Sequence, residues 1–499
     1  NYPSPFLSTH SVHHSSIRGG HLSMASPPPP SSTPSPPVPS PALVPPASGP
    51  SSSASKEDIE KGTDKDDDAS LPRSTGSREG FNSRPRGKRS KTISENEMFG
   101  YFRGLVKKML NKKYATAGGY FPFKYTDIKI VLKMVKRCFE SEPTMVECKV
   151  PVVIIGDLHG QFGDLSRIFD MFIEDGTPGY LNTRYVFLGD YVDRFKEIDL
   201  ILSITHIHFR GRQSLEIIMM VFLLKVLHPT EFMLLRGNHE CRAINKAYGF
   251  AAEMRERFLD PKRSLQIFDA FNNVFTHMPL ACLVGGNILC MHGGISSKIT
   301  SREDILKIKR PIKDVSEIPI ATDLLWADPM IGLKGEIPNK VRGVSVYFGE
   351  DVLDQVMKNL NLKLVVRGHQ MMMNGFNFYG RNQMATVFSA AAYYPDKPNR
   401  GSVMVVKNDG RIGFRVIIPL ASDHPASKSK VFRGDHDVAN DFDTGYVKVA
   451  PHVAAAKAAA AARKQKESKE GEGGGGAPIA PSAEIVPPGV TVEVVKKER

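Results

Sequence analysis

Six side chains that could bind metal ions follow short apolar runs of the sequence. The runs PVVII, YVFL, FMLLR, NILCM and LKLVV lead directly into the clusters GDLHG, GDYVDR, GNHE, HGG and RGHQ. The candidate ligands in these clusters are Asp157, His159, Asp190, Asn238, His292 and His369. Carboxylates, an amide oxygen and imidazoles, without a thiolate, suit Mn²⁺, Fe or Zn²⁺. Six ligands exceed the needs of one ion, so they favour two ions that share a bridging carboxylate.

A bridged pair of metal ions is suited to phosphoryl transfer, because it clamps both the attacking and the leaving oxygen. Arg194 and Arg342 could add bidentate contacts to a phosphate. Each residue also has a simpler explanation, since a single Asp after a strand is commonly a turn or cap residue. Repetition of the pattern after five runs is much harder to explain by caps.

The apolar runs must supply the elements that position these side chains. Continuous runs of Val, Ile, Leu and Phe are typical of strands buried on both faces. Helical patterns over 161–173 and 214–227 lie between some of them. Strands that alternate with helices predict an α/β sheet. Ligand sites in such sheets lie beyond the carboxyl ends of the strands, where all five clusters fall.

Composition divides the 499-residue chain into one globular region and two tails. The Pro/Ser-rich and basic stretch 1–95 and the Ala/Lys/Gly-rich stretch 423–499 have too little apolar surface to fold, and we expect them to be disordered. The region 96–422 is long enough for a sizeable core and is predicted to be the catalytic domain. Because the sequence begins with Asn1, Met24 is a candidate for the natural start.

Charge and cysteine content restrict the partners and the compartment. The net charge of +13 indicates acidic partners, and the run RPRGKRSK at 84–91 fits a nuclear import signal or a solvated linker. Nucleic-acid binding is disfavoured because the basic runs lack interleaved aromatic residues. Five cysteines without a CxxC spacing fit a reduced protein of the cytoplasm, the nucleus or both. No apolar run reaches the roughly 18 residues of a membrane span, so no membrane partner is expected.

The motifs GDLHGQ, GDYVDR, LRGNHE, HGG and RGHQ, in this order, resemble those of the serine/threonine phosphoprotein phosphatases. GNHECRAINKAYGF at 237–250 and TDLLWADP at 322–329 are most similar to the type 1 branch of that family. The resemblance covers about 96–420. It implies an α/β metallophosphatase β-sandwich of mixed sheets flanked by helices. It also implies hydrolysis of phosphoserine and phosphothreonine in proteins, by attack of a hydroxide held between two divalent ions, most simply Mn²⁺, with Fe or Zn²⁺ as alternatives.

The resemblance also implies a role for each candidate residue. Asp157, His159 and Asp190 would hold the first metal, with Asp190 as the bridge, and Asn238, His292 and His369 would complete the second. His239 would be the general acid that protonates the leaving oxygen, oriented by Asp193. Phosphate would be bound by Arg194, Arg342 and Asn238, with Tyr393 nearby.

The sequence departs from the family at two places near the expected site. Val341 stands where an acidic residue usually precedes the phosphate-binding arginine. The loop that reads SAPNYC in the type 1 enzymes reads SAAAYY at 389–394, which places Tyr394 at the position of the cysteine that microcystins modify. We therefore expect altered substrate and toxin access.

An apolar groove that binds Arg-Val-x-Phe motifs of regulatory subunits is also implied by the resemblance. The matching positions, all apolar, are Ile288, Leu364, Phe378 and Phe414. Asn382 and Ala385 replace Arg and Val of the family, and Gly285-Gly286 replaces an acidic pair. Loss of negative charge should weaken binding of the basic end of such motifs.

An apolar insert at 195–210 interrupts GDYVDR and the residues that follow it in the family. Removing it restores GDYVDRGRQSLE. Codons for Arg194-Phe195-Lys196 can contain a GT splice donor, and codons for His208-Phe209-Arg210 can contain an AG acceptor. We therefore interpret 195–210 as an unspliced intron. Two alternatives to protein phosphatase activity remain open. One is a catalytically impaired scaffold that keeps the fold, and the other is a metallophosphoesterase that acts on small phosphates.

Overall fold

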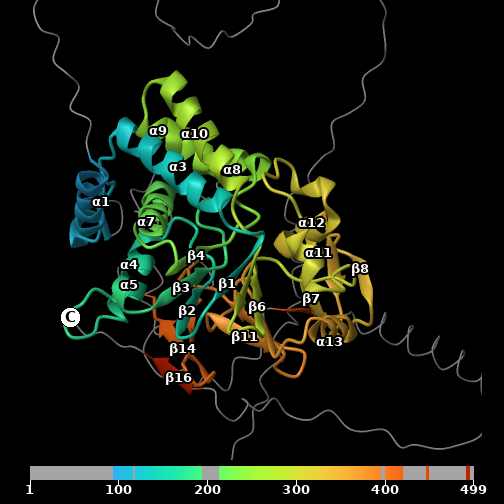
Figure 1. Ribbon diagram of the computed structural model, residues 1–499. Coiled ribbons are helices and arrows are strands. Elements are labelled where there is room, and N and C mark those ends of the chain that lie inside the picture. The colour runs from blue at the N-terminus through green and yellow to red at the C-terminus, as the bar shows by residue number, and fades with distance from the viewer. Residues whose placement is uncertain are drawn as a thin grey trace, which may run out of the picture. The chain divides into compact units, whose positions relative to one another are not determined.

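The computed structural model describes residues 94–115, 119–193, 213–394, 399–419, 446–448 and 491–494. Within these residues the strands form three sheets (Figure 1). The strand orders are β1-β5-β6-β10-β12-β11 in the first sheet, β16-β14-β13-β2-β3-β4 in the second and β15-β7-β9-β8 in the third. Both six-stranded sheets mix parallel with antiparallel pairs, as the resemblance implies.

The predicted apolar runs form strands that carry the candidate ligands at their carboxyl ends. PVVII contains β2 (Val152–Ile155), YVFL contributes to β3 (Arg184–Phe187) and FMLLR contains β4 (Phe232–Leu234). NILCM contains β6 (Ile288–Met291), and LKLVV contributes to β10 (Leu364–Arg367). The remaining strands of the two larger sheets are β1 (Met145–Cys148), β5 (Ala281–Val284), β11 (Phe376–Tyr379), β12 (Met384–Val387), β13 (Gly401–Val406), β14 (Ile412–Ile417) and β16 (Thr491–Val494). The smallest sheet is built from β7 (Asp328–Ile331), β8 (Glu336–Pro338), β9 (Val346–Phe348) and β15 (Val447–Lys448).

The two larger sheets pack face to face around a shared apolar core. Val152 and Ile154 of β2 point into that core, together with Val366 of β10 from the other sheet. Val153 and Ile155 point to the opposite face of β2, where helices cover the sheet. Because successive side chains of a strand alternate between faces, burial of all four residues requires cover on both sides. The arrangement is a sandwich of mixed sheets, and the predicted fold class is confirmed.

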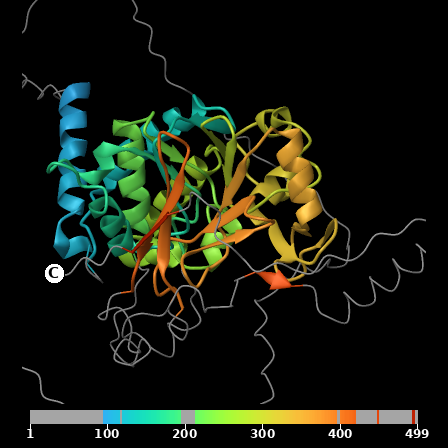
Figure 2. The ribbon, with the colours of Figure 1, turned by 90° about the horizontal axis from the view of Figure 1, so that it is seen from below.

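Helices lie on both outer sides of the sandwich (Figure 2). The second sheet is covered by α1 (Glu95–Met109), α3 (Tyr125–Glu140), α4 (Phe162–Asp170), α7 (Ser214–Leu227), α9 (Phe250–Arg257) and α10 (Pro261–Phe275). The first sheet is covered by α11 (Arg302–Leu306), α12 (Pro319–Trp326) and α13 (Glu350–Asn359). Shorter helices are α2 (Lys112–Ala115), α5 (Gly179–Asn182), α8 (Arg242–Ala247) and a 3₁₀ turn at Val315–Glu317.

Helix α7 lies in the middle of its layer, between β4 and the helices α1, α3 and α9. Every residue from Ser214 to Val226 is buried. A helix that is apolar on all sides is stable only in such a position. Its bounds, Ser214–Leu227, agree with the helix predicted at 214–227.

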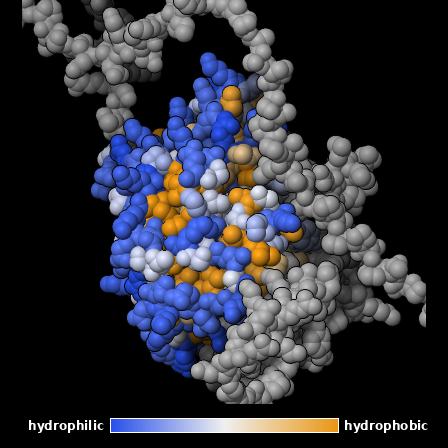
Figure 3. Space-filling model, turned by 90° about the vertical axis from the view of Figure 1, so that its right-hand side faces the viewer, coloured by the Kyte–Doolittle hydropathy of each residue, from blue (hydrophilic) through white to orange (hydrophobic). Residues whose placement is uncertain are grey.

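Most apolar side chains are used in these cores, so the surface is largely hydrophilic. Seen from the side of α11, α12 and β8, the described surface shows apolar residues gathered in its middle and bordered by hydrophilic ones (Figure 3). None of the helices in the described part of the chain combines the length and apolar character that crossing a bilayer requires.

Two segments of the stretch 423–499 form strands of these sheets. Val447–Lys448 pairs with β7, and Thr491–Val494 pairs with β14, both in parallel. The sheets therefore extend beyond the boundary expected at residue 422. Residues 1–93, most of the expected N-terminal tail, lie outside the described residues.

Candidate metal centre

Five strands end around one point, where all six predicted metal ligands meet. Parallel pairing of β2 with β3 and of β3 with β4 brings Asp157, Asp190 and Asn238 to the same edge of the second sheet. Parallel pairing of β6 with β10 does the same for His292 and His369 in the first sheet. A bridge between Asp157 and Phe388 joins the two sheets at this edge.

The first group of ligands is centred on the His159 imidazole. Its Nε2 lies 3.7 Å from Asp157 Oδ2 and 3.5 Å from Asp190 Oδ2. Its Nδ1 lies 3.1 Å from the carbonyl oxygens of both Val192 and Asp193. A proton on Nδ1 would satisfy these carbonyls and leave the Nε2 lone pair for a cation. Burial lowers the pKa of His159, but the carboxylates of Asp157 and Asp190 outweigh burial and raise the pKa to about 9.

The second group consists of an amide oxygen and two imidazole nitrogens. Asn238 Oδ1 lies 2.7 Å from His292 Nε2 and 2.9 Å from His369 Nδ1, and these two nitrogens are 3.1 Å apart. Burial lowers the pKa of His369 well below its usual range, and the charge of Arg342 adds to this effect. His369 is therefore neutral and offers a lone pair. With the Asn238 amide reversed, its NH₂ group would instead donate to Asp190 and to both imidazoles.

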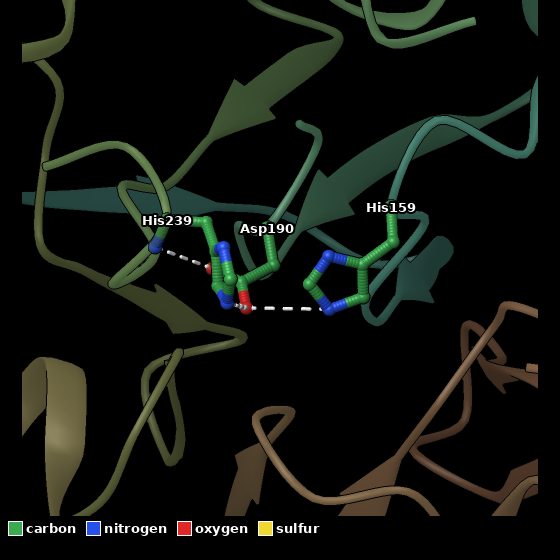
Figure 4. Close-up of side chains that lie close together, drawn as sticks. All are labelled: His159, Asp190 and His239. Atoms are coloured by element: carbon green, nitrogen blue, oxygen red, sulfur yellow. Dashed lines mark hydrogen bonds and ion pairs between the residues drawn. The ribbon is translucent and has the colours of Figure 1, made fainter. Parts of the chain in front are cut away.

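Asp190 lies between the two groups. Its Oδ2 is 3.5 Å from His159 Nε2 and 3.3 Å from His292 Nε2, while its Oδ1 accepts a hydrogen bond of 2.9 Å from the His239 backbone N–H. Figure 4 shows the carboxylate between the rings of His159 and His239. One carboxylate in contact with both groups is the arrangement expected of a bridging ligand.

His239 differs from the other histidines of the site. Its Nδ1 lies 3.0 Å from Asp193 Oδ2, and its Nε2 lies 3.9 Å from Asp190 Oδ2. By distance alone it could complete a metal group with His159 and Asp190. Its side chain, however, is 14% exposed, whereas that of His292 is fully buried. Asp193 is held in turn by the backbone N–H of Phe250 at 2.7 Å.

Four residues of the site have backbone conformations in the left-handed region. The φ angles are 42° at His159, 55° at Asp190, 68° at Asp193 and 68° at His369. Such conformations are uncommon for residues other than glycine, and they persist only where the surroundings hold them. The tight turns that follow β2, β3 and β10 thus aim their side chains at the common centre.

Arg342 and Tyr393 border the two groups. The Arg342 guanidinium donates from Nε to Asp328 Oδ2 at 3.0 Å and from Nη2 to the His369 carbonyl at 3.2 Å. The ring of Tyr393 lies 5.1 Å from that of His159 and 4.9 Å from that of Tyr394. Val341 is 59% exposed. Arg194, predicted to bind phosphate, and the insert 195–210 lie outside the described residues.

Comparison with known proteins agrees with this geometry. Residues 150–373 match the family described as calcineurin-like phosphoesterase. Over 280 residues the chain is 38% identical to the serine/threonine-protein phosphatase PP1-delta of Caenorhabditis elegans, an alignment that spans 56% of this chain and 83% of that protein. The chain belongs to the serine/threonine protein phosphatase family. A solved phosphatase from Saccharomyces cerevisiae, described as similar to human phosphatase PP5, matches with a TM-score of 0.54 and 30% identity over 64% of this chain and 96% of that one.

The family implies two divalent metal ions, and the side chains of this phosphatase fit that requirement. Carboxylate, amide and imidazole atoms converge in two groups that share Asp190. Among the described residues, His292 Nδ1 and His369 Nε2 are buried without a hydrogen-bond partner, while the opposite nitrogen of each ring faces the centre of its group. The donor set contains no sulfur, in agreement with the predicted oxygen and nitrogen ligands.

Glu240 is a structural determinant of the phosphatase site to which the sequence analysis gave no role. Its fully buried carboxylate accepts hydrogen bonds from the backbone N–H groups of Asp190 at 2.8 Å, Gly237 at 2.9 Å and Tyr191 at 3.0 Å. Burial, reinforced by the charge of Asp190, raises the pKa of Glu240 to about 7. Its place in GNHE is a local signal, but its partners Asp190 and Tyr191 follow β3, which is distant in sequence.

Glu240→Gln should lower the free energy of unfolding by about 1–3 kcal/mol, because an amide NH₂ would then face backbone N–H donors. Denaturant unfolding followed by fluorescence measures the change. The matched control is Glu174→Gln, a substitution at an exposed position that should change stability by less than about 0.5 kcal/mol. Equal stability of the two variants would contradict a supporting role for Glu240.

Proposed function

We propose that this phosphatase hydrolyses phosphoserine and phosphothreonine in proteins. The observation that supports metal-dependent hydrolysis is the Asp190 carboxylate, which contacts both groups of potential ligands. Asp157, His159 and Asp190 would hold one ion, and Asn238, His292, His369 and Asp190 the other. Two such ions, most simply Mn²⁺, with Fe or Zn²⁺ as alternatives, supply a water of lowered pKa and neutralise charge on the phosphate.

His239 is proposed as the general acid. Donation from Nδ1 to Asp193, at 3.0 Å, fixes the ring and leaves Nε2 on the side of Asp190. From there Nε2 would deliver its proton to the leaving serine or threonine oxygen. The buried Asp193 carboxylate would stabilise the positive charge of the ring before that transfer.

Arg342 is proposed to bind the phosphate. Asp328 engages its Nε and the His369 carbonyl engages its Nη2, so the guanidinium is held beside the metal ligands. Asp328 also accepts from Arg367 Nη2 at 2.9 Å, which fixes the carboxylate itself. We expect Asn238 and Arg194 to contribute further contacts, with the Tyr393 ring at the border of the site.

The substrate class follows from the relatives rather than from the metal ligands. The name of the Caenorhabditis relative states its specificity for serine and threonine, and that alignment extends over 280 residues. We propose the same class of substrate here, with the catalytic domain at 96–422. The departures at Val341 and Tyr394 are expected to change substrate and toxin access. We also propose a cytoplasmic or nuclear location for the protein.

Docking of regulatory subunits is a further part of the proposal. Ile288, Leu364, Phe378 and Phe414 lie in one apolar cluster of the structure. Gly285 and Gly286, which replace an acidic pair, both have positive φ. We expect binding of an Arg-Val-x-Phe peptide to be weaker than in type 1 catalytic subunits, because this end of the cluster lacks negative charge.

Hydrolysis by the purified protein, with and without residues 195–210, tests the proposed function. Substrates are one peptide phosphorylated on serine, the same peptide phosphorylated on tyrosine, and a nucleoside monophosphate. We expect Mn²⁺-dependent release of phosphate from the phosphoserine peptide, suppressed by a chelator, and little from the others. Faster hydrolysis of the nucleotide would replace the proposal with an activity on small phosphates. Binding of metal without turnover in either form would favour a scaffold.

A further inference from the structure

The side chain of Tyr446 lies on the outer, helix-covered face of the first sheet. Its hydroxyl is 3.1 Å from the Asn377 carbonyl oxygen and 2.9 Å from Thr386 Oγ1, and only 7% of the residue is exposed. Because the hydroxyl has one proton, it can donate to the carbonyl while it accepts from the Thr386 hydroxyl. Asn377 and Thr386 are directly paired in the register of β11 and β12, so the hydroxyl lies over that pair.

A buried arginine continues this row of residues. Thr386 is also paired directly with Arg367 of β10, and paired residues present their side chains on the same face of a sheet. Arg367 is fully buried, and burial lowers its pKa, whereas the neighbouring Asp328 carboxylate and the Tyr446 side chain act against burial. The Tyr446 hydroxyl is therefore within electrostatic reach of the Arg367 guanidinium.

Arg367 and Arg342 share one carboxylate. Asp328 Oδ1 accepts from Arg367 Nη2 at 2.9 Å, and Asp328 Oδ2 accepts from Arg342 Nε at 3.0 Å. Arg342 in turn donates from Nη2 to the His369 carbonyl at 3.2 Å, beside the metal ligands. A displacement of Arg367 would therefore move the carboxylate that orients Arg342.

The Tyr446 ring also packs near the strand that carries Asp328. The ring lies 5.6 Å from that of Tyr379, and the Tyr379 hydroxyl donates to the Met330 carbonyl at 3.1 Å. Met330 belongs to β7, of which Asp328 is the first residue. The residues that follow Tyr446, Val447–Lys448, pair with the same strand. Two series of contacts thus lead from Tyr446 to Asp328, one through the hydroxyl and one through the ring.

We propose that Tyr446 is a positioning residue of the phosphate site, which holds Arg342 in place through Arg367 and Asp328. The inference rests on the proposed role of Arg342 in binding phosphate. It gives a function to a residue of the stretch 423–499, which is distant in sequence from every motif of the site. A chain that ends at residue 422 would therefore lack part of the support of its phosphate-binding arginine.

Binding of inorganic phosphate to the Mn²⁺-loaded protein tests the proposal without reference to turnover. Tyr446→Phe removes the hydroxyl and keeps the ring, which avoids a cavity. Calorimetric titration should show about fivefold weaker phosphate binding, the scale of one buried hydrogen bond. The matched control is Tyr185→Phe, which also removes a buried tyrosine hydroxyl, bonded to the Gly179 carbonyl at 2.8 Å, and should leave phosphate affinity unchanged. Unchanged affinity in Tyr446→Phe, or an equal loss in the control, would overturn the proposal.

Combination with Arg342→Ala shows whether Tyr446 acts through that arginine. Arg342→Ala alone should weaken phosphate binding at least about tenfold, the scale of hydrogen bonds to charged groups. Addition of Tyr446→Phe should then cause no further loss, because effects of residues in one network do not add.

The same titrations separate a failure of the inference from a failure of the proposed function. A loss in Arg342→Ala without a loss in Tyr446→Phe would reject the role of Tyr446 and leave that of Arg342 intact. Losses that multiply in the double variant would also reject the positioning role, since Tyr446 would then act independently of Arg342. Full phosphate affinity in Arg342→Ala would overturn the proposed role of Arg342 and the inference with it.

Discussion

Deletion of residues 195–210 is expected to raise kcat/KM for a phosphoserine peptide by about a hundredfold, the scale on which a catalytic group misplaced by roughly 1 Å costs rate. In the deletion variant Arg194 is followed directly by Gly211. The insert begins immediately after Asp193 and Arg194, the proposed orienting and phosphate-binding residues. Steady-state kinetics of the 499-residue protein and of the deletion variant, at equal metal content, measure the difference.

The residues that flank the insert meet at one place in the structure. The backbone N–H of Gly160 donates to the Tyr191 carbonyl at 3.0 Å, and the Gly160 carbonyl accepts from the Gln213 N–H at 3.1 Å. The segments before and after the insert are thus both hydrogen-bonded to Gly160. After deletion, Arg194, Gly211 and Arg212 would join Asp193 to Gln213, a connection that can span about 13 Å. We expect this connection to leave Tyr191 and Gln213 bonded to Gly160.

Other contacts hold Gln213 and the beginning of α7, which follow the insert, independently of the insert itself. The Gln213 side chain donates to the carbonyls of Tyr114 at 2.8 Å and Gly119 at 2.7 Å. At the beginning of α7, the Glu253 carboxylate accepts from the N–H groups of Ser214 at 3.0 Å and Leu215 at 2.9 Å. We therefore expect the deletion variant to fold with α7 unchanged, and its unfolding transition provides the check.

The matched control replaces 195–210 with Gly and Ser residues of the same number. If the apolar character of the insert is responsible for the impairment, this control should recover part of the rate; if its length is responsible, only the deletion should. Sequencing of the mature transcript across the junction tests the intron interpretation separately. A 499-residue protein that is as fast as the deletion variant would contradict the predicted impairment.

The predicted metal ligands could be found from the sequence because each follows a strand that is visible locally. His292 directly follows an apolar run, Asp157 and Asp190 follow one after a single glycine, and the carboxyl ends of parallel strands in one sheet share an edge. Helix α7 could be placed for the same reason, since its run of apolar residues needs no distant partner to be recognised. The proposed roles of the metal ligands depend on the resemblance and stay predictions.

Interactions between distant segments could not be read in this way. Glu240 binds backbone groups of the turn after β3, and Asp328 receives Arg342 and Arg367 from two other segments. The positive φ angles at Asp190 and His369 are imposed by these surroundings and not by the residue types. Tyr446 and the strand at 491–494 lie in stretches whose composition indicates disorder, and only their contacts with β11, β12 and β14 reveal them.

His239→Ala is expected to lower turnover of a phosphoserine peptide by about a hundredfold or more, the usual scale of positioned acid–base catalysis. The ring contacts Asp193 through Nδ1 and faces Asp190 with Nε2, so the substitution removes the proposed proton donor. The Asp190 carboxylate keeps its bond from the backbone N–H of residue 239, which does not require the ring. Metal content, measured by elemental analysis, should therefore be unchanged.

The dependence of this loss on the leaving group distinguishes an acid from a metal ligand. p-Nitrophenolate is a stable anion that leaves without protonation, whereas a serine alkoxide is not. The rate lost by His239→Ala should thus be much smaller with p-nitrophenyl phosphate than with the phosphoserine peptide. His228→Gln, at the end of α7 against Phe232, is the control and should change neither rate. Loss of metal, or an equal loss of rate with both substrates, would show that His239 acts as a ligand and that the proposed division of roles within GNHE is wrong.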